Sequence, residues 1–216
     1  MSEPITSTPV ARSPIPPAPP TKIVEGWEIS LRRSEAALRL TDLTPLAKVL
    51  VRAPEKGPTA DALAVPLGRV VRRHRSLLAG SAPGEWFATG AVGTADALAE
   101  DLRARADGSE VVSVVDLTHG RALVRLAGHA AADLLSMTCT IDLSDRGMAD
   151  GAALRTYVAQ IVTDILRDDR EGIPSYLLHC EQSSGRYLFE SLIQLGDEFA
   201  LGVTGFEDEF RGDDAV

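Results

Sequence analysis

The sequence predicts an α+β protein made of two related lobes, in which antiparallel strand pairs are covered by helices. Three segments repeat the order strand, strand, helix, at residues 76–106, 111–136 and 157–199. Runs of β-branched apolar residues favour the strands, and apolar residues at helical spacing favour the helices. The apolar face of a strand pair has to be covered, and the helix that follows each pair can cover it.

In the first lobe, helices and strands alternate with clear turn signals. Pro83-Gly84 is one such signal and predicts a hairpin. Thr94 is a good helix N-cap, and the residues after it place an apolar stripe on one helical face. The predicted elements of this lobe are helices at 34–40, 60–65 and 94–106 and strands at 46–52, 76–79 and 85–89.

The second lobe begins with the valine-rich stretch 111–115, which predicts a largely buried strand. Asp116-Leu117-Thr118 ends this run. Near the end of the chain, Ser183 or Ser184 is expected to cap a final helix with one apolar face. The other predicted elements of this lobe are strands at 121–126, 157–166 and 174–180 and a helix at 130–135.

Three short matches occur in the same order in both lobes and indicate an internal duplication of 42–63 and 116–135. Any one of them alone is at chance level, but their offset stays between 72 and 74 residues. We therefore expect a pseudo-twofold relation between the two segments. The matches are Asp42-Leu43-Thr44 with Asp116-Leu117-Thr118, Leu50-Val51-Arg52 with Leu123-Val124-Arg125, and Ala60–Leu63 with Ala132–Leu135.

Length and composition limit the function classes. A chain of 216 residues with 44% hydrophobic residues can bury a core. Its net charge of −9 opposes phosphate binding, so we expect no nucleic-acid partner. No apolar run approaches the roughly 20 residues that cross a bilayer, and no secretory signal begins the chain. We therefore expect a cytoplasmic protein without membrane contact, in which Cys139 and Cys180 are buried thiols.

The first 22 residues hold seven of the thirteen prolines. This composition predicts a disordered tail at 1–22. The alternative is an extended arm on a partner subunit, with Ile15, Pro16 and Pro17 at the contact. The acidic residues 206–216 are predicted to be frayed, which leaves a folded domain at 23–205.

One dense basic run, RVVRRHR, occupies residues 69–75. The simpler interpretation is a solvated hairpin face. The alternative is a patch that meets an acidic partner or ligand, with Arg69, Arg72 and Arg73 in the contact.

The sequence contains no motif for catalysis, cofactor binding or metal binding. Glycine-rich phosphate loops, G-x-S-x-G and H-E-x-x-H are missing, and the four histidines lack ligand spacing. Asp42 and Asp116 end strands at equivalent places, and we interpret each as the cap of its own turn and not as a general base. No catalytic, cofactor-binding or metal-binding residue is therefore expected in this chain.

A family resemblance is carried by four segments: 82–87 (APGEWF), 115–121 (VDLTHGR), 126–135 (LAG with ADLL) and 139–143 (CTIDL). Through these segments the chain resembles the gamma-subunit family of heterotetrameric sarcosine oxidase, which is similar to the glycine cleavage T-protein, an aminomethyltransferase. The family patterns are Gly-Pro-Asp-Glu-Trp-Leu, Val-Asp-Val-Ser-Asp-Gly-Arg, Leu-Ser-Gly with its following helix, and Cys-Pro-Ile-Asp-Leu. The likeness covers about 27–200, and Gly84 and Thr140 depart from the patterns.

The resemblance implies a T-protein (aminomethyltransferase) folate-binding-domain-like fold over 23–205. It also implies a non-catalytic structural gamma subunit of a complex that oxidatively demethylates an N-methyl amine, sarcosine, and transfers the one-carbon unit to tetrahydrofolate. FAD, FMN, NAD and tetrahydrofolate are then expected in the larger alpha and beta flavoprotein subunits. The alternative is a stand-alone folate-binding protein that resembles an aminomethyltransferase or demethylase.

Overall fold

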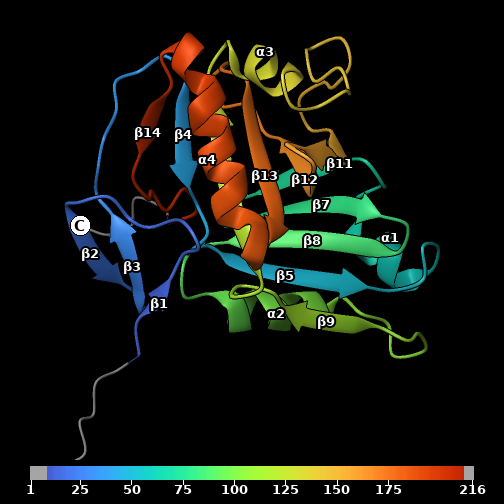
Figure 1. Ribbon diagram of the computed structural model, residues 1–216. Coiled ribbons are helices and arrows are strands. Elements are labelled where there is room, and N and C mark those ends of the chain that lie inside the picture. Colours follow the sequence, from blue (N-terminus) through green and yellow to red (C-terminus); the bar gives the residue numbers. More distant parts are fainter. Residues whose placement is uncertain (1–8, 212–216) are drawn as a thin grey trace, which may run out of the picture.

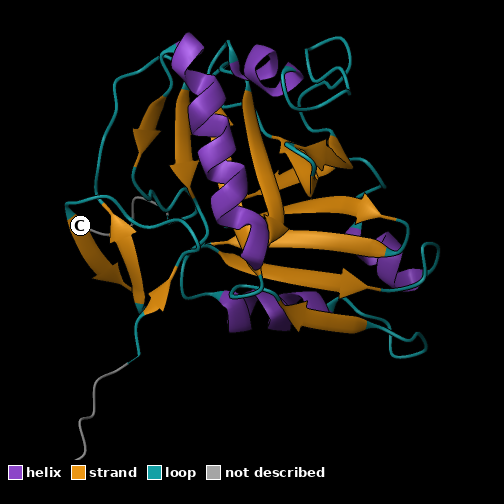
Figure 2. Cartoon of the chain, in the orientation of Figure 1, coloured by secondary structure: helices purple, strands orange, loops and turns teal. Residues whose placement is uncertain are grey.

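The computed structural model describes residues 9–211 and shows two packed β-sheets with helices on their outer faces (Figure 1). A small three-stranded sheet near the N-terminus stands beside them. Strands predominate and helices are few, as Figure 2 shows, so the predicted α+β class is confirmed.

The two large sheets are mainly antiparallel. The six-stranded sheet has the order β11-β12-β13-β10-β4-β14, and the five-stranded sheet has the order β6-β7-β8-β5-β9. The strands of the six-stranded sheet are β4 (Arg39–Asp42), β10 (Arg121–Ala127), β11 (Ala153–Val158), β12 (Ile161–Arg167), β13 (Ser175–Glu181) and β14 (Gly202–Thr204). Those of the five-stranded sheet are β5 (Ala47–Arg52), β6 (Val70–Arg73), β7 (Ser76–Ala82), β8 (Glu85–Gly90) and β9 (Ser113–Asp116).

The helices cover the outer faces of the two sheets, and a third apolar layer lies between the sheets. Helices α3 (Ala131–Ser136) and α4 (Gly185–Gly196) pack on the six-stranded sheet, and α1 (Pro58–Leu63) and α2 (Ala95–Ala104) pack on the five-stranded one. Two 3₁₀ turns, η1 (Gln182–Ser184) and η2 (Asp197–Phe199), flank α4. No helix in the described part of the chain is long and apolar enough to cross a membrane.

The two halves of the chain have the same element order, and they exchange their first strands. The series β5-α1-β6-β7-β8-α2 in the first half matches β10-α3-β11-β12-β13-α4 in the second. The strand that opens the first half, β4, pairs with β10, whereas the strand that opens the second half, β9, pairs with β5. An internal duplication with strand exchange would produce this topology.

In strands β5 and β10, the alignment of the two halves that follows from strand pairing differs by two positions from the alignment that sequence similarity gives. The two pairings that define it are Asp42 opposite Val124 and Asp116 opposite Val49. Leu50 therefore corresponds to Arg125, two residues beyond Leu123. Because side chains alternate with a period of two, the shift keeps each residue on the same sheet face.

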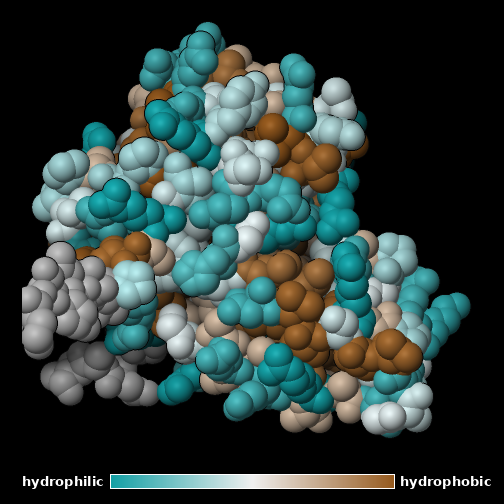
Figure 3. Space-filling model, turned by 60° about the horizontal axis from the view of Figure 1, so that its bottom comes forward, coloured by the Kyte–Doolittle hydropathy of each residue, from teal (hydrophilic) through white to brown (hydrophobic). Residues whose placement is uncertain are grey.

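The valine-rich stretch does not form a largely buried strand. Its strand, β9, is an edge strand that pairs only with β5 among the described residues, and Val111 before it is 92% exposed. An edge strand has a neighbour on one side only, so its β-branched residues are not enclosed. Figure 3 turns the bottom of Figure 1, where β9 lies, towards the reader. This face has a band of hydrophobic side chains bordered by hydrophilic ones.

Two local predictions were wrong. Residues 34–40 form no helix, since the chain there leads into β4, which pairs with β10 and β14. Strand pairing outweighs weak helix propensity. The single strand expected at 157–166 is the β11–β12 hairpin, whose turn residues Ala159 and Gln160 have φ of 48° and 66°. Asn and Gly normally signal such a turn, and neither is present.

The prediction of disorder is wrong for the part of the proline-rich tail that the structure describes. β1 (Ala11–Arg12) pairs with β3 (Trp27–Ser30), and β2 (Thr21–Val24) pairs with the other side of β3. Ile15 is only 5% exposed and lies in the core under α4. One buried apolar side chain and strand pairing offset the cost of ordering this segment. Residues 1–8 lie outside the described residues.

The acidic C-terminal segment is also ordered as far as it is described. Phe206 and Phe210 are buried in the layer between the sheets. Glu209 forms ion pairs with Arg125 and Arg170. The prediction of fraying is therefore wrong up to residue 211, because two buried aromatic side chains and the ion pairs of Glu209 hold this segment against the core. The last residues lie beyond the described part.

Candidate functional site

Two Asp-Leu-Thr turns carry the chain between the sheets, one after β4 and one after β9. Asp42 Oδ1 accepts the N–H of Thr44 at 2.9 Å, and Asp116 Oδ1 accepts that of Thr118 at 2.7 Å. Burial raises the pKa of Asp42, although the Thr44 hydrogen bonds act in the other direction. The prediction that each carboxylate caps its own turn is confirmed.

The threonines of these turns join the two halves reciprocally. Thr44 Oγ1 accepts the backbone N–H of Leu123 at 3.1 Å, and Thr118 Oγ1 accepts that of Lys48 at 3.1 Å. The backbone N–H groups of Leu43 and Leu117 donate to the carbonyls of the same two residues. Each turn therefore completes the backbone hydrogen bonding of the other half.

We expect Thr118→Val to lower the free energy of unfolding by about 1–3 kcal/mol, because the buried N–H of Lys48 loses its acceptor. Thr44→Val should cost a similar amount. Thr138→Val is the matched control, since its hydroxyl donates only to Leu135 within the same helical turn. Urea denaturation followed by circular dichroism measures all three. A Thr118→Val variant as stable as the control would contradict this role of the turn.

Lys48 lies between the two turns and is fully buried. Its Nζ donates to the carbonyls of Thr44 at 2.5 Å and Leu46 at 2.8 Å. Burial lowers the pKa of Lys48 to about 7, against the attraction of Asp42 and Asp116. A lysine with a lowered pKa can act as a nucleophile, but this amine is enclosed by protein and has no access to a substrate.

A second buried polar group lies between the sheets under β12 and β13. Arg155 Nε donates to Asp164 Oδ1 at 2.7 Å, and His179 Nε2 is 3.4 Å from Asp164 Oδ2. The His179 ring stacks on Phe87 with centroids 4.0 Å apart, and neither ring nitrogen has a hydrogen-bond partner among the described residues. Burial holds the pKa of His179 well below its usual value and, despite Arg155, raises that of Asp164.

A third cluster joins β6, β10 and the C-terminal segment through five charged side chains. Arg72 Nε and Nη2 donate to Asp168 Oδ1 at 2.9 Å and Oδ2 at 2.6 Å. Arg125 Nη2 reaches Asp168 at 3.0 Å and Glu209 at 2.7 Å, and Arg170 contacts the same two acids. Burial raises the pKa of Asp168, but Arg72, Arg125 and Arg170 outweigh it and hold that pKa below its usual value.

Of the arginines proposed for a partner contact, two are engaged within the chain. Arg72 belongs to the buried cluster, and Arg73 Nη2 donates to the carbonyl of Leu63 at the end of α1 at 2.9 Å. Arg69 is exposed at the start of this hairpin. Arg72 of the basic run therefore links the two halves of the chain. Of the three arginines, only Arg69 has a side chain that is exposed to a partner.

The arm residues proposed for the partner contact lie beside a cavity of about 220 Å³. Ile15, Pro16 and Pro17 form one wall, and Phe189 and Ile193 of α4 form another. Ile15 is part of this protein's own core, so it cannot serve a partner without being pulled out. Pro16 is exposed and Pro17 is half-buried.

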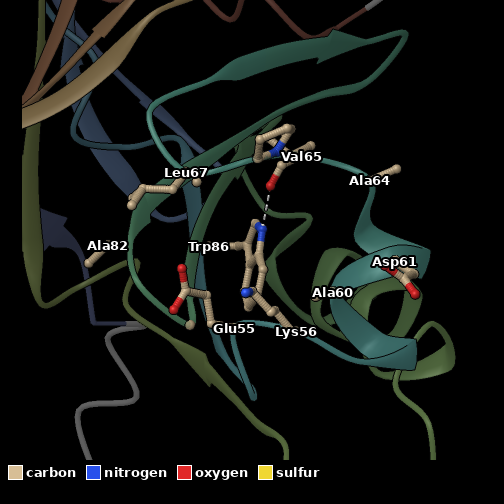
Figure 4. A pocket seen from close by; sticks show the side chains of 12 residues that line it. Glu55, Lys56, Ala60, Asp61, Ala64, Val65, Leu67, Ala82 and Trp86 are labelled. Atoms are coloured by element: carbon tan, nitrogen blue, oxygen red, sulfur yellow. Dashed lines mark hydrogen bonds between the residues drawn. The ribbon is translucent and has the colours of Figure 1, made fainter.

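A larger groove of about 470 Å³ lies between α1 and the β7–β8 hairpin (Figure 4). The indole of Trp86 forms its floor, and the Trp86 Nε1 donates to the carbonyl of Val65 at 2.8 Å. Leu67 lies on the rim and is 53% exposed. Trp86 itself is buried, and nothing in the sequence pointed to the open groove beside it.

Within residues 9–211 no group of histidine, cysteine, aspartate and glutamate side chains is arranged to hold a metal ion. Cys139 and Cys180 are free and buried, as expected from the sequence. Burial raises the pKa of the Cys180 thiol to about 11, which leaves it unreactive at neutral pH.

Comparison with known proteins gives matches in structure. No family model matches the sequence, and no curated protein matches it significantly. A chain of the heterotetrameric sarcosine oxidase from Corynebacterium sp. U-96 superposes with a TM-score of 0.67 at 24% identity, over 79% of this chain and 89% of that one. Aminomethyltransferase T of the glycine cleavage system from Bartonella henselae gives 0.61 at 20% identity, over 86% of this chain. The chain has the aminomethyltransferase fold.

This chain spans about half, 55%, of the length of the aminomethyltransferase from Bartonella henselae. Within the aminomethyltransferase fold, the three buried polar clusters lie where the two halves meet. Sequence reasoning identified Asp42 and Asp116 because their turns are local. It missed Lys48, His179 and Arg125, whose burial depends on how the two sheets pack.

Proposed function

We propose that this chain is the non-catalytic structural gamma subunit of a heterotetrameric sarcosine oxidase-type complex. The observation that carries the proposal is the superposition on a chain of heterotetrameric sarcosine oxidase, which extends over 89% of that chain. The four sequence segments that resemble the gamma-subunit family support the same assignment.

The internal chemistry supports a structural role. The carboxylates of Asp42 and Asp116 cap turns, and those of Asp164 and Asp168 are bound by arginines. The pair of Arg72 with Asp168 joins the two halves, and the sheets enclose the side chains of Lys48 and His179. The carboxylates of these four acids are thus engaged by hydrogen bonds or ion pairs within the chain.

In the proposed complex the larger alpha and beta flavoprotein subunits carry FAD, FMN and NAD and oxidise the N-methyl amine, sarcosine. Tetrahydrofolate accepts the one-carbon unit in a partner subunit. The complex is cytoplasmic. The gamma subunit would contribute a rigid surface that binds these partners.

Co-expression of the tagged chain with the alpha and beta subunits tests the proposal. We expect one stoichiometric complex that shows flavin absorption and oxidises sarcosine, whereas the chain purified alone does neither. The measurements are size-exclusion chromatography with mass determination, a visible spectrum and sarcosine-dependent oxygen consumption. Turnover of sarcosine by the isolated chain would overturn the structural assignment.

A stand-alone folate-binding protein is the alternative, because the chain also superposes on aminomethyltransferase T over 86% of its length. Calorimetric titration of the isolated chain with tetrahydrofolate separates the two functions. The subunit assignment expects no binding by the free chain. Saturable binding at a single site would favour the alternative.

A further inference from the structure

The two halves of the fold differ at one connection, the segment between the first helix and the strand that follows it. In the first half residues 64–67 connect α1 to the turn at Gly68, and in the second half residues 137–150 connect α3 to the turn at Gly151. These glycines correspond, since both have φ of +76°. Gly68 N–H donates to Gly80 and Gly151 N–H donates to Arg167, each in the adjacent strand.

The same correspondence pairs two aromatic residues. Trp86 lies opposite Gly80 in the first half, and Tyr176 lies opposite Arg167 in the second. Each aromatic donates its polar hydrogen to a backbone carbonyl of the connection after the helix: Trp86 Nε1 to Val65 at 2.8 Å and Tyr176 OH to Leu143 at 2.6 Å.

In the second half the long connection covers the aromatic ring completely. Leu143 and Met148 of this connection are buried in the core, and Tyr176 is fully buried. Arg167 anchors the connection through hydrogen bonds to Asp145 and the carbonyl of Met148, and its guanidinium lies 5.4 Å from the centre of the Tyr176 ring.

In the first half the corresponding space is open. Its short connection follows the edge of the sheet, and Gly80 stands where the second half has Arg167. The result is the groove over Trp86, with the small side chains of Ala60, Ala64 and Ala82 on its walls (Figure 4). Lys56 and Glu55 stand at its mouth, and Leu67 is exposed on its rim.

We propose that a loop of a partner subunit fills this groove, taking the place that residues 139–150 occupy in the second half. The loop would bring an aliphatic side chain of the size of Leu143 or Met148 against the exposed Leu67, beside the buried indole of Trp86. Its flanking charges would meet Lys56 and Glu55. The inference rests on the proposed function, because it names the surface through which the gamma subunit binds its complex.

The test compares Leu67→Glu with Val111→Glu in the full chain, each combined with the alpha and beta subunits. Both changes put a carboxylate on an exposed aliphatic residue, and Val111 lies outside the groove. We expect Leu67→Glu to weaken assembly by about tenfold or more, as loss of a central apolar contact does, and Val111→Glu to leave it unchanged. Circular dichroism confirms that both variants are folded.

A cross-linking residue supplies the second measurement. p-Benzoylphenylalanine at position 67 should form a photo-cross-link to a partner subunit, and at position 111 it should not. Assembly of Leu67→Glu as tight as that of the wild type, an equal loss in both variants, or a cross-link only within the chain would overturn the groove assignment. A wild-type chain that does not assemble at all would instead contradict the proposed function, and the groove assignment with it.

Discussion

We expect Arg125→Met to lower the free energy of unfolding at neutral pH by about 3–5 kcal/mol, the usual cost of removing one partner from a buried ion pair. Arg125 is only 8% exposed. Its guanidinium bonds the carboxylates of Asp168 and Glu209, and it donates to the Asp168 carbonyl at 3.2 Å. The variant leaves two acids in the interior with fewer cations, and it loosens the contact between β10 and the C-terminal segment.

Arg52→Met is the matched control. Arg52 pairs with Glu85 at 2.9 Å, but its side chain is largely exposed, so the loss should stay below about 1 kcal/mol. Guanidinium chloride denaturation at several pH values gives both numbers. Because protonated acids tolerate burial better, the difference between Arg125→Met and the wild type should shrink in acid. Equal losses in the two variants would show that the cluster does not stabilise the fold.

The second large effect is an acid destabilisation that begins near pH 6.5 and depends on His179. Burial holds the pKa of this imidazole well below its usual value of 6.5, with a further lowering by Arg121, Arg155 and Lys48. The unfolded chain therefore binds a proton that the folded chain refuses. Stability is fully present above pH 6.5 and falls as the pH drops towards the folded pKa, by up to about 1.4 kcal/mol per pH unit.

His179→Leu should remove this component between pH 6.5 and 5 and leave stability at pH 8 nearly unchanged, because neither ring nitrogen has a hydrogen-bond partner among the described residues. The raised pKa of Asp164 acts in the opposite sense, since a folded state that holds a proton gains stability in acid. His74→Leu, at an exposed site, is the control and should behave as the wild type. Melting temperatures of the wild type and of both variants, measured across this pH range, test the expectation. A pH dependence that persists in His179→Leu would rule out this imidazole as its source.

The candidate groove shows the limit of sequence reasoning at a functional surface. No sequence pattern pointed to a groove beside Trp86, which is buried. That its upper side faces an open groove follows from the short connection at 64–67 and from Gly80 in the adjacent strand. Only the comparison of the two halves in space makes this gap visible, because the corresponding connection at 137–150 has no similarity to it in sequence.

The sequence by itself determined the features that depend on neighbouring residues. The β7–β8 hairpin follows from Pro83-Gly84, the Asp-Leu-Thr turns from hydrogen bonds that span two residues, and helices α2 and α4 from apolar periodicity. Each of these energies is contained within a short segment, so the local pattern is sufficient to predict it.

The tertiary structure decided the features whose partners are far apart in the chain. Residues 39–42 are a strand because β10 pairs with them, and Ile15 is buried because α4 packs over it. Arg72 forms an ion pair within the chain because the fold brings Asp168, 96 residues away in the sequence, next to it. Pairing, burial and ion-pair energies depend on which segments the fold brings together, and a single sequence does not state those distances.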